Sequence, residues 1–180
     1  ENFYYFHKPS KFERMIGSVP DKIAVIGKGL VQSFAMYSDI SVITAPAFRY
    51  HHLYDSKIEE FKGENILISL PISFSVANYL IKFCTSSILV EYAENVVINY
   101  HPALNIKLLN SSTQFTFTDK NFSEIIKKCG IVISNLSSVC IESLALGVPV
   151  IVVQGGSSIN QNPIPMNIEK NIWDECDNQH

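Results

Sequence analysis

From Gly63 onward, the sequence alternates short apolar runs with segments in which apolar residues recur at helical spacing. The runs are continuous, without alternating polar residues, which is typical of strands buried on both faces of a sheet. Strands that alternate with helices in this way form a parallel sheet with helices on both faces. We therefore expect an α/β fold, with strands at 65–70, 96–100, 114–118, 131–134 and 149–153 and helices at 73–83, 103–109, 122–129 and 137–146.

Prolines and glycines mark the ends of these elements. Pro71 and Pro102 follow the first two strands, where a residue without a backbone N–H can end the pairing. Gly130 and Gly147 follow helical segments, and glycine is common there because the residue after a helix often adopts a left-handed conformation. We expect the two helices to end at these glycines.

Residues 1–55 carry a weaker version of the same pattern. Residues 21–27 and 40–44 favour strands, residues 30–37 favour a helix, and residues 45–54 favour a loop or short helix. We interpret residues 1–55 as the end of a preceding α/β domain and a linker, because the polar stretch 56–63 separates them from the longer alternation. Residues 56–180 then form the second domain.

Composition limits the class of protein. The chain has 180 residues, of which 47% are hydrophobic and 17% charged, and its net charge is −3. This composition excludes a globally disordered chain, and the acidic balance argues against a general nucleic-acid-binding protein. Every apolar run is far shorter than the roughly 20 residues of a spanning helix. Glu1 is not followed by a basic segment and an apolar one, so we expect no signal peptide and a cytoplasmic location.

The cysteines favour a reducing compartment. None of the four has a C-x-x-C neighbour, and they are Cys84, Cys129, Cys140 and Cys176. Cys84 and Cys140 lie in apolar segments, which predicts small buried residues rather than a disulfide framework. No His/Cys group has the spacing of a zinc site, so we expect no metal.

Polar residues and glycines gather where the expected strands end. Ligands of parallel α/β sheets bind outside the carboxyl ends of the strands, so these residues are candidates for a binding site. They are Ser69 and Ser73 around the first strand end, His101 and Pro102 after the second, Ser134 at the end of the fourth, and Gly155 and Gly156 after the fifth.

Ser137 and Ser138 stand at the expected start of a helix. Free backbone N–H groups and the helix dipole favour an anion there, and two hydroxyls add donors. Glu142 lies one turn later on the same face as Ser138, where its carboxylate can accept from ribose hydroxyls. The same residues also suit an ordinary N-cap and a surface glutamate, and both readings stay open.

His101 lies between a strand and a proline that restricts the following turn. Its imidazole can donate to a phosphate oxygen or protonate a leaving group, although a structural loop histidine is the alternative. Gly155 and Gly156 allow close approach of the backbone to a ligand, but glycine pairs also mark ordinary loops. The absence of G-x-G-x-x-G argues against a dinucleotide-dependent oxidoreductase.

The most specific segment is residues 131–151, with the sequence IVISNLSSVCIESLALGVPVI. It resembles the strand, serine pair, glutamate-bearing helix, Gly-x-Pro and strand of the C-terminal, nucleotide-sugar-binding domain of GT-B glycosyltransferases. With His101-Pro102 upstream, it is most similar to bacterial CMP-sugar transferases, the sialyl and Kdo transferases of surface polysaccharide synthesis. The resemblance covers about residues 65–153 and implies a Rossmann-like domain.

The resemblance implies a role for each matched residue. His101 would contact the nucleotide phosphate and assist the departure of CMP, Ser137 and Ser138 would hold that phosphate, and Glu142 would bind the ribose. Ser69 and Ser73 would line the nucleotide cleft. The implied partners are a nucleotide sugar, a glycan acceptor and an N-terminal domain of the same protein, without a metal. The implied location is the cytoplasm, or within it the inner face of the membrane.

The sequence also departs from this family. The acidic tripeptide that supplies the general base of sialyltransferases is absent, since Asp174-Glu175 is followed by Cys176 rather than glycine. Asn99-Tyr100 stands where a lysine or arginine is frequent. A complete enzyme of this fold has two domains of typical size, so we expect this chain to be a part that is inactive alone, with the general base elsewhere.

Two alternatives remain. One is an enzyme of the same fold that resembles UDP-sugar epimerases. The other is a non-catalytic Rossmann-like binding module that docks a partner through the aromatic segment Phe3-Tyr4-Tyr5-Phe6. The transferase hypothesis requires His101, Ser137, Ser138 and Glu142 to meet at one cleft, whereas a docking module does not.

Overall fold

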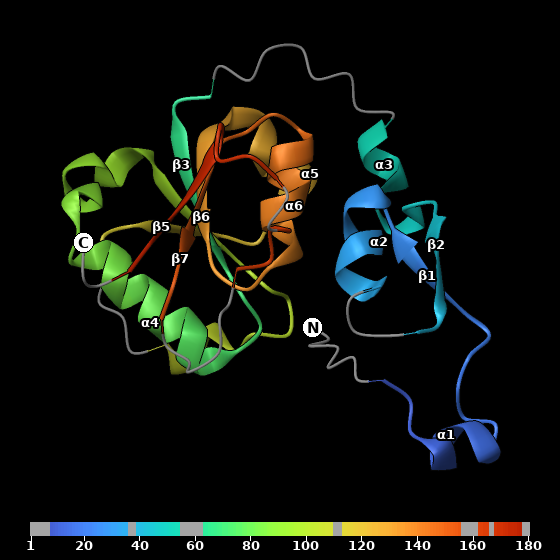
Figure 1. Cartoon of the computed structure of the whole chain (residues 1–180). Helices are drawn as coiled ribbons and strands as arrows, with labels where there is room; N and C mark the ends of the chain where they lie inside the picture. Colours follow the sequence, from blue (N-terminus) through green and yellow to red (C-terminus); the bar gives the residue numbers. More distant parts are fainter. Residues whose placement is uncertain are drawn as a thin grey trace. The chain divides into compact units, whose positions relative to one another are not determined.

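Six parallel strands form the central sheet of the unit that spans Ser56–His180 (Figure 1). The strands are β3 (Asn65–Leu70), β4 (Val96–Tyr100), β5 (Thr116–Thr118), β6 (Cys129–Ser134), β7 (Val150–Val153) and β8 (Trp173–Cys176). Their order is β5-β4-β3-β6-β7-β8, and each neighbouring pair is parallel. This is the strand order of a doubly wound, Rossmann-like fold. The predicted α/β fold with a parallel sheet is confirmed.

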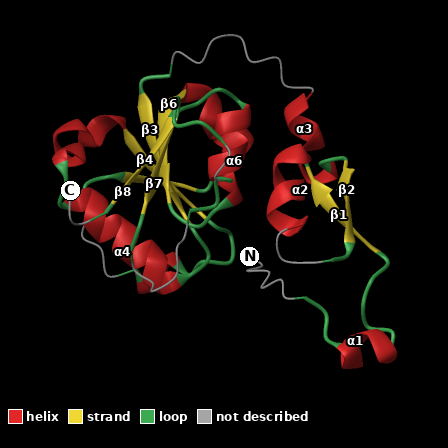
Figure 2. Cartoon of the chain, in the orientation of Figure 1, coloured by secondary structure: helices red, strands yellow, loops and turns green. Residues whose placement is uncertain are grey.

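Helices lie on both sides of this sheet, with α4 (Phe74–Thr85) on one side and α6 (Ser138–Ala145) on the other (Figure 2). A short helix, α5 (Phe122–Ile125), accompanies α6. Three 3₁₀ segments complete the unit: η2 (Ile88–Asn95), η3 (Ile106–Leu108) and η4 (Ile126–Lys128). The helix predicted at residues 103–109 is wrong, because only the single turn η3 forms there.

The end predicted for the helix at residues 122–129 is also wrong. The helical turns stop at Lys128, and both Cys129 and Gly130 belong to β6. A Cβ atom on Gly130 would lie 2.4 Å from the backbone oxygen of Gly63. Glycine is needed there because two backbones cross closely, not because a helix ends.

Two elements of this unit were not predicted from the sequence, the segment η2 and the strand β8. Asp174 and Glu175 are exposed in β8, which pairs on one side only, with β7. Charged residues are common in such edge strands because they oppose pairing with other chains. The pattern of continuous apolar runs therefore does not reveal this strand.

The core of this unit lies mainly between α4 and the sheet. Residues Ile68 and Leu70 of β3 face α4 together with Ile133 of β6. Leu67 and Ser69 alternate with them and so face the opposite side, yet they are also buried. The buried cluster against α4 consists of Ile68, Leu70, Ala77, Leu80, Ile81, Cys84, Val96, Ile98, Leu104, Leu109, Phe115, Ile133 and Val153.

The unit Glu1–Asp55 is smaller and contains a two-stranded parallel sheet. Its elements are α1 (Lys11–Met15), β1 (Lys22–Ile26), α2 (Lys28–Ala35), β2 (Ser41–Ala45), η1 (Phe48–Tyr50) and α3 (His51–Tyr54). The helix α2 lies between β1 and β2 in the chain, as the sequence predicts. That these residues end a preceding domain remains a prediction.

The structure, a computed structural model, describes residues 8–35, 39–54, 63–109, 113–155, 162–165 and 168–177. The aromatic segment Phe3–Phe6, most of the predicted linker and Gly156 lie outside the described residues. In the described part of the chain, none of the helices has the length and hydropathy needed to cross a bilayer. Three of the four cysteine side chains are buried, and all four are free thiols.

Candidate functional site at the carboxyl edge of the sheet

The sheet changes its direction of winding between β3 and β6. The chain moves from β3 outward to β4 and β5, and then returns to pair β6 with the other side of β3. The carboxyl ends of strands at such a switch point border the crevice in which doubly wound folds bind their ligands. The segments that follow β3, β4, β6 and β7 contain the residues singled out from the sequence.

The start of α6 follows β6 at this edge. Ser137 is the N-cap, and its Oγ accepts a hydrogen bond from the Val139 amide at 3.3 Å. Ser138 is the first helical residue, and its Oγ donates to Oε1 of Glu142 at 3.2 Å. The prediction that Ser138 and Glu142 share a face is confirmed.

The start of α4 follows β3 at the same edge. Ser73 is its N-cap with an extended backbone, and its side chain forms no capping hydrogen bond. The Ser73 Oγ instead lies 3.2 Å from the Oγ of Ser75. The edge therefore carries the starts of two helices after neighbouring strands, each with the positive end of its dipole at the switch point.

His101 directly follows β4 and is exposed. Its Nδ1 accepts a hydrogen bond from the Ala103 amide at 3.1 Å, within a turn that the Leu104 amide closes on the His101 carbonyl at 2.8 Å. A ring nitrogen that accepts this bond carries no proton, so the neutral ring has its proton on Nε2. The turn containing Pro102 thus presents Nε2–H as a hydrogen-bond donor.

Ser69 and Ser134 are paired across β3 and β6, and both are buried. The Oγ of Ser134 donates to the backbone oxygen of Ser69 at 2.7 Å. This bond lies at the last pairing of the two strands, directly beneath the switch point. The Ser134 hydroxyl therefore joins β3 and β6, the two strands next to the switch point.

Asn135 was overlooked by the sequence analysis, although it follows β6 directly. Its side chain is fully buried, its Nδ2 donates to the backbone oxygen of Val153 at the end of β7, and its Oδ1 accepts from the Leu136 amide. These bonds fix the loop between β6 and α6 against the neighbouring strand. The signal available was an asparagine after a buried strand, a residue that often bonds nearby backbone.

Gly155 follows β7 with a φ of 128°. A Cβ atom there would lie 2.3 Å from ring atoms of Tyr79, so only glycine allows this approach. The Tyr79 hydroxyl donates to the backbone oxygen of Gln154 at 3.0 Å. Burial first, and then the charges of Asp177 and Cys176, raise the pKa of Tyr79, which keeps this hydroxyl protonated as a donor.

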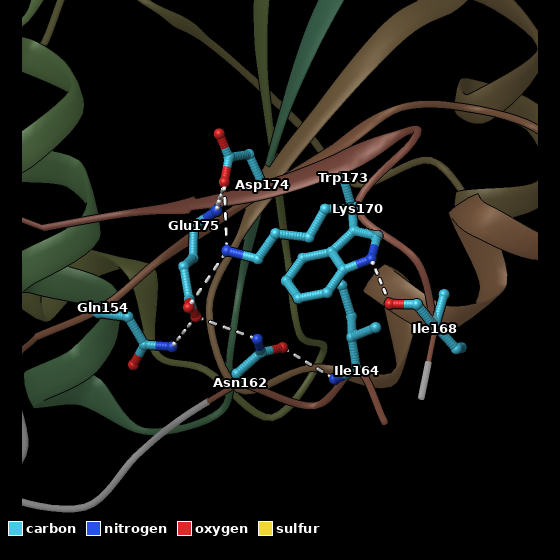
Figure 3. A network of polar contacts seen from close by, with 8 residues as sticks. All are labelled: Gln154, Asn162, Ile164, Ile168, Lys170, Trp173, Asp174 and Glu175. Carbon is cyan, nitrogen blue, oxygen red and sulfur yellow. Dashed lines mark hydrogen bonds and ion pairs between the residues drawn. The ribbon is translucent and has the colours of Figure 1, made fainter. Parts of the chain in front are cut away.

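A polar network joins β8 to the segments that precede it (Figure 3). Lys170 Nζ lies 3.4 Å from Asp174 Oδ1, 3.5 Å from Glu175 Oε1 and 5.0 Å from the centre of the Trp173 ring. Oε2 of Glu175 accepts from Gln154 at 3.3 Å and from Asn162 at 3.1 Å. The backbone N–H of Glu175, and then Lys170, lower the pKa of Asp174. This network fixes β8 beside the end of β7.

Few cationic side chains stand at this edge. In the described segments 71–73, 101–105, 119–121, 135–138 and 154–155, Lys120 is the one lysine or arginine. The Nδ2 of Asn99 donates to the backbone oxygen of Lys120 at 3.0 Å. The positive character available to an anion therefore comes mainly from helix starts and neutral N–H and O–H donors.

The order of the strands determines which candidates are neighbours. The β3 and β6 segments are adjacent, whereas His101 follows β4, which lies on the other side of β3. Two strand spacings amount to roughly 10 Å, a distance that one nucleotide can bridge. Within the part of the chain that the structure describes, no three His, Cys, Asp or Glu side chains form a group suited to a metal ion.

The sequence matches no protein-family model, and no curated protein is significantly similar to it.

Proposed function

We propose that the unit Ser56–His180 binds the nucleotide of an activated sugar and forms the donor-binding part of a GT-B glycosyltransferase. The observation that carries this proposal is the placement of Ser73, His101, Ser137 and Ser138 at one edge of a sheet whose order has its switch point between β3 and β6. That edge is where doubly wound folds bind nucleotides. The resemblance of residues 131–151 to the family supports the same site.

The phosphate of the donor would lie at the start of α6. The positive end of the α6 dipole would attract its oxygens, and the Ser138 hydroxyl would turn from Glu142 Oε1, to which it donates in the structure, to donate to one of them. A CMP-linked sugar contains a single phosphodiester, so departure of CMP places one additional negative charge on this phosphate. The helix dipole, which is fixed by the fold, stabilises that charge without reorganising.

His101 would act from the neighbouring strand end. Its Nε2–H can donate to a phosphate oxygen, because its Nδ1 is held by the Ala103 amide. Donation from Nε2–H to the departing phosphate would stabilise the charge that develops there, which makes His101 a candidate catalytic residue. Glu142 would accept from the ribose hydroxyls. The general base and the acceptor site would belong to a second domain, and the membrane-bound or soluble acceptor would be a glycan.

Isothermal titration of the chain with CMP, CDP, UMP and UDP tests this proposal. We expect CMP to bind most tightly. His101→Ala and Ser138→Ala should each weaken it by about 1–3 kcal/mol, the range for hydrogen bonds to charged groups. His51→Ala is the matched control, since His51 is another exposed histidine but lies in the smaller unit.

Each result has a distinct meaning. Preference for UDP would move the donor class toward the epimerase-like alternative at the same site. If no nucleotide binds to the chain or to a protein that includes its second domain, the proposal fails and a docking module is favoured. Loss of thermal stability in the variants without a change in affinity would assign His101 and Ser138 to structure.

A further inference from the structure

The hydroxyl of Ser138 already has a partner at the start of α6. Its Oγ donates to Oε1 of Glu142 at 3.2 Å, and both residues are partly buried. A serine hydroxyl carries a single proton, so it cannot donate to Glu142 and to a phosphate at the same time. A phosphate that takes this proton therefore removes a hydrogen bond from the Glu142 carboxylate.

Loss of that hydrogen bond opposes the binding of a ligand that offers a phosphate alone. Hydrogen bonds to a charged group are among the stronger ones, and a partly buried carboxylate that loses a donor loses stabilisation. The phosphate is itself an anion, and it would lie about one helical turn from the Glu142 carboxylate, where like charges repel. A phosphate needs a further group on the same ligand to offset both effects.

The hydroxyls of a ribose are such a group. Four residues along an α-helix rise about 6 Å, which is the separation of Ser138 and Glu142 along the axis of α6. A ribose 5′-phosphate extends over a similar length between its phosphate and its 2′,3′-diol. The diol can therefore donate to Glu142 while the phosphate accepts from Ser138, and each donor in the exchange has an acceptor.

Ser137, the neighbouring serine, takes no part in this exchange. Its Oγ accepts a hydrogen bond from the Val139 amide at 3.3 Å, and that bond does not use the hydroxyl proton. Donation by Ser137 to a phosphate would take nothing from Glu142. The contribution of Ser138 to phosphate binding should thus depend on the ribose, whereas the contribution of Ser137 should not.

We propose that the Ser138–Glu142 pair restricts the site to ligands that carry a phosphate and a ribose diol together, and so selects 5′-ribonucleotides. A 2′-deoxyribonucleotide offers one donor fewer to Glu142, so Ser138 gains less by turning to the phosphate. A nucleoside has the diol but no phosphate, so its ribose competes with Ser138 for Glu142. This selection rests on the proposed function and adds to it a dependence between the phosphate and ribose contacts.

Isothermal titration of the full chain with CMP, 2′-deoxy-CMP and cytidine tests the selection. We expect CMP to bind several-fold more tightly than 2′-deoxy-CMP. Ser138→Ala should weaken the binding of CMP several-fold and that of 2′-deoxy-CMP much less, because the two contacts are coupled. The same variant should strengthen the binding of cytidine, whose ribose no longer competes with a serine hydroxyl.

Two further variants complete the experiment. Glu142→Gln replaces one acceptor oxygen by an NH₂ donor and should remove most of the preference for CMP over 2′-deoxy-CMP. Ser137→Ala is the matched control, and it should weaken the binding of both nucleotides by the same factor. Far-UV circular dichroism verifies that each variant is folded.

The results that overturn the selection differ from those that overturn nucleotide binding. Equal losses of affinity for CMP and 2′-deoxy-CMP in Ser138→Ala would show that the phosphate and ribose contacts are independent. Weaker binding of cytidine in that variant would show that Ser138 orients Glu142 rather than competing for it. In both cases nucleotide binding stands. Failure of every nucleotide to bind, to the chain and to a protein that includes its second domain, would overturn the proposed function as well.

Discussion

The two units of the chain both contain parallel strands joined by a helix, but they differ in what they bury. In the larger unit, Leu67, Ile68, Ser69 and Leu70 of β3 are buried one after another, which requires cover on both faces of the sheet. In the smaller unit, the β1 and β2 face that contains Ile26 and Ile43 is exposed. Among the residues of that unit whose side chains are described, Val25 alone is buried.

This difference shows that a strand signal in the sequence does not specify burial. Residues 22–26 and 65–70 are both apolar runs, yet only the second is enclosed. Parallel sheets are ordinarily covered on both faces, because crossover helices pack on each side. The larger unit meets this condition with α4 on one face and α6 on the other, whereas the described part of the smaller unit contributes α2 to one face.

Truncation of a core side chain should give the largest difference in stability loss between the two units. Leu80→Ala should lower the free energy of unfolding of the larger unit by about 2–5 kcal/mol, because Leu80 is fully buried and a cavity would remain. Ile43→Ala, at a side chain that is 45% exposed, should change stability by about 0.5 kcal/mol or less. Urea unfolding followed by far-UV circular dichroism measures both. Equal losses of unfolding free energy in the two variants would contradict the difference in burial between the units.

Alkaline pH should weaken the larger unit alone. Burial raises the pKa of Cys84 and Cys140 to about 12 and that of Cys129 to about 11, from 9.0. Since the folded state holds these protons more tightly, their stabilising contribution is complete below pH 9 and is lost as pH rises from 9 toward 12. Between pH 9 and 10 the loss should approach about 1 kcal/mol per buried thiol.

Fluorescence of Trp173, the single tryptophan, reports on the larger unit in this experiment. Urea midpoints measured at pH 8, 9 and 10 should fall, and Cys140→Ala should make the fall shallower. A midpoint that stays constant across this range would argue against buried, protonated thiols.

Adding a methyl group at a glycine should again distinguish the units. Gly130→Ala places a Cβ atom 2.4 Å from the Gly63 oxygen and should destabilise the larger unit by about 1–3 kcal/mol. Gly17, in the smaller unit, has a φ of 70° but no atom within 4 Å of an added Cβ. Gly17→Ala should therefore lower the free energy of unfolding by about 1 kcal/mol, because alanine disfavours a positive φ even where space is available. Thermal unfolding of the two variants compares them, and a larger loss at Gly17 would refute the close crossing at Gly130.

The smallest effect is expected at the ion pair of the smaller unit. Arg14→Ala should lower the free energy of unfolding by about 0.2–1 kcal/mol, because Arg14 and Asp39 are both well exposed and water screens their attraction. High salt should reduce the cost further. Lys22→Ala, at an exposed lysine of the same unit, is the control. A loss of several kcal/mol would mean that this contact organises the smaller unit far more than its exposure suggests.

The sequence predicted the strands of the larger unit well because their apolar runs are continuous and their ends are marked. It missed β8, where Asp174 and Glu175 face solvent on an edge strand. It misassigned Gly130, because a glycine required by a close backbone crossing looks the same as one that ends a helix. Such crossings depend on residues distant in the chain, here Gly63, and so leave no local pattern.

At the candidate site, sequence spacing correctly predicted that Ser138 and Glu142 share one face of a helix, and in the structure the two side chains are hydrogen-bonded. It did not show that the hydroxyl of Ser134 is used between strands, or that Asn135 and Tyr79 fix the loops after β6 and β7. These contacts join residues far apart in the sequence, and only strand pairing brings them together. The contacts that hold these loops were therefore harder to predict than the spacing of two residues within one helix.

The central claim is that a nucleotide binds at the carboxyl edge of the larger sheet, around the switch point between β3 and β6. Titration of the isotope-labelled chain with CMP, followed by backbone amide chemical shifts, tests it most directly. We predict shifts concentrated at residues 71–76, 101–104 and 135–142, with residues 63–65, 95–96 and 128–130 at the opposite edge unchanged. Shifts centred on that opposite edge or on the smaller unit would contradict the account.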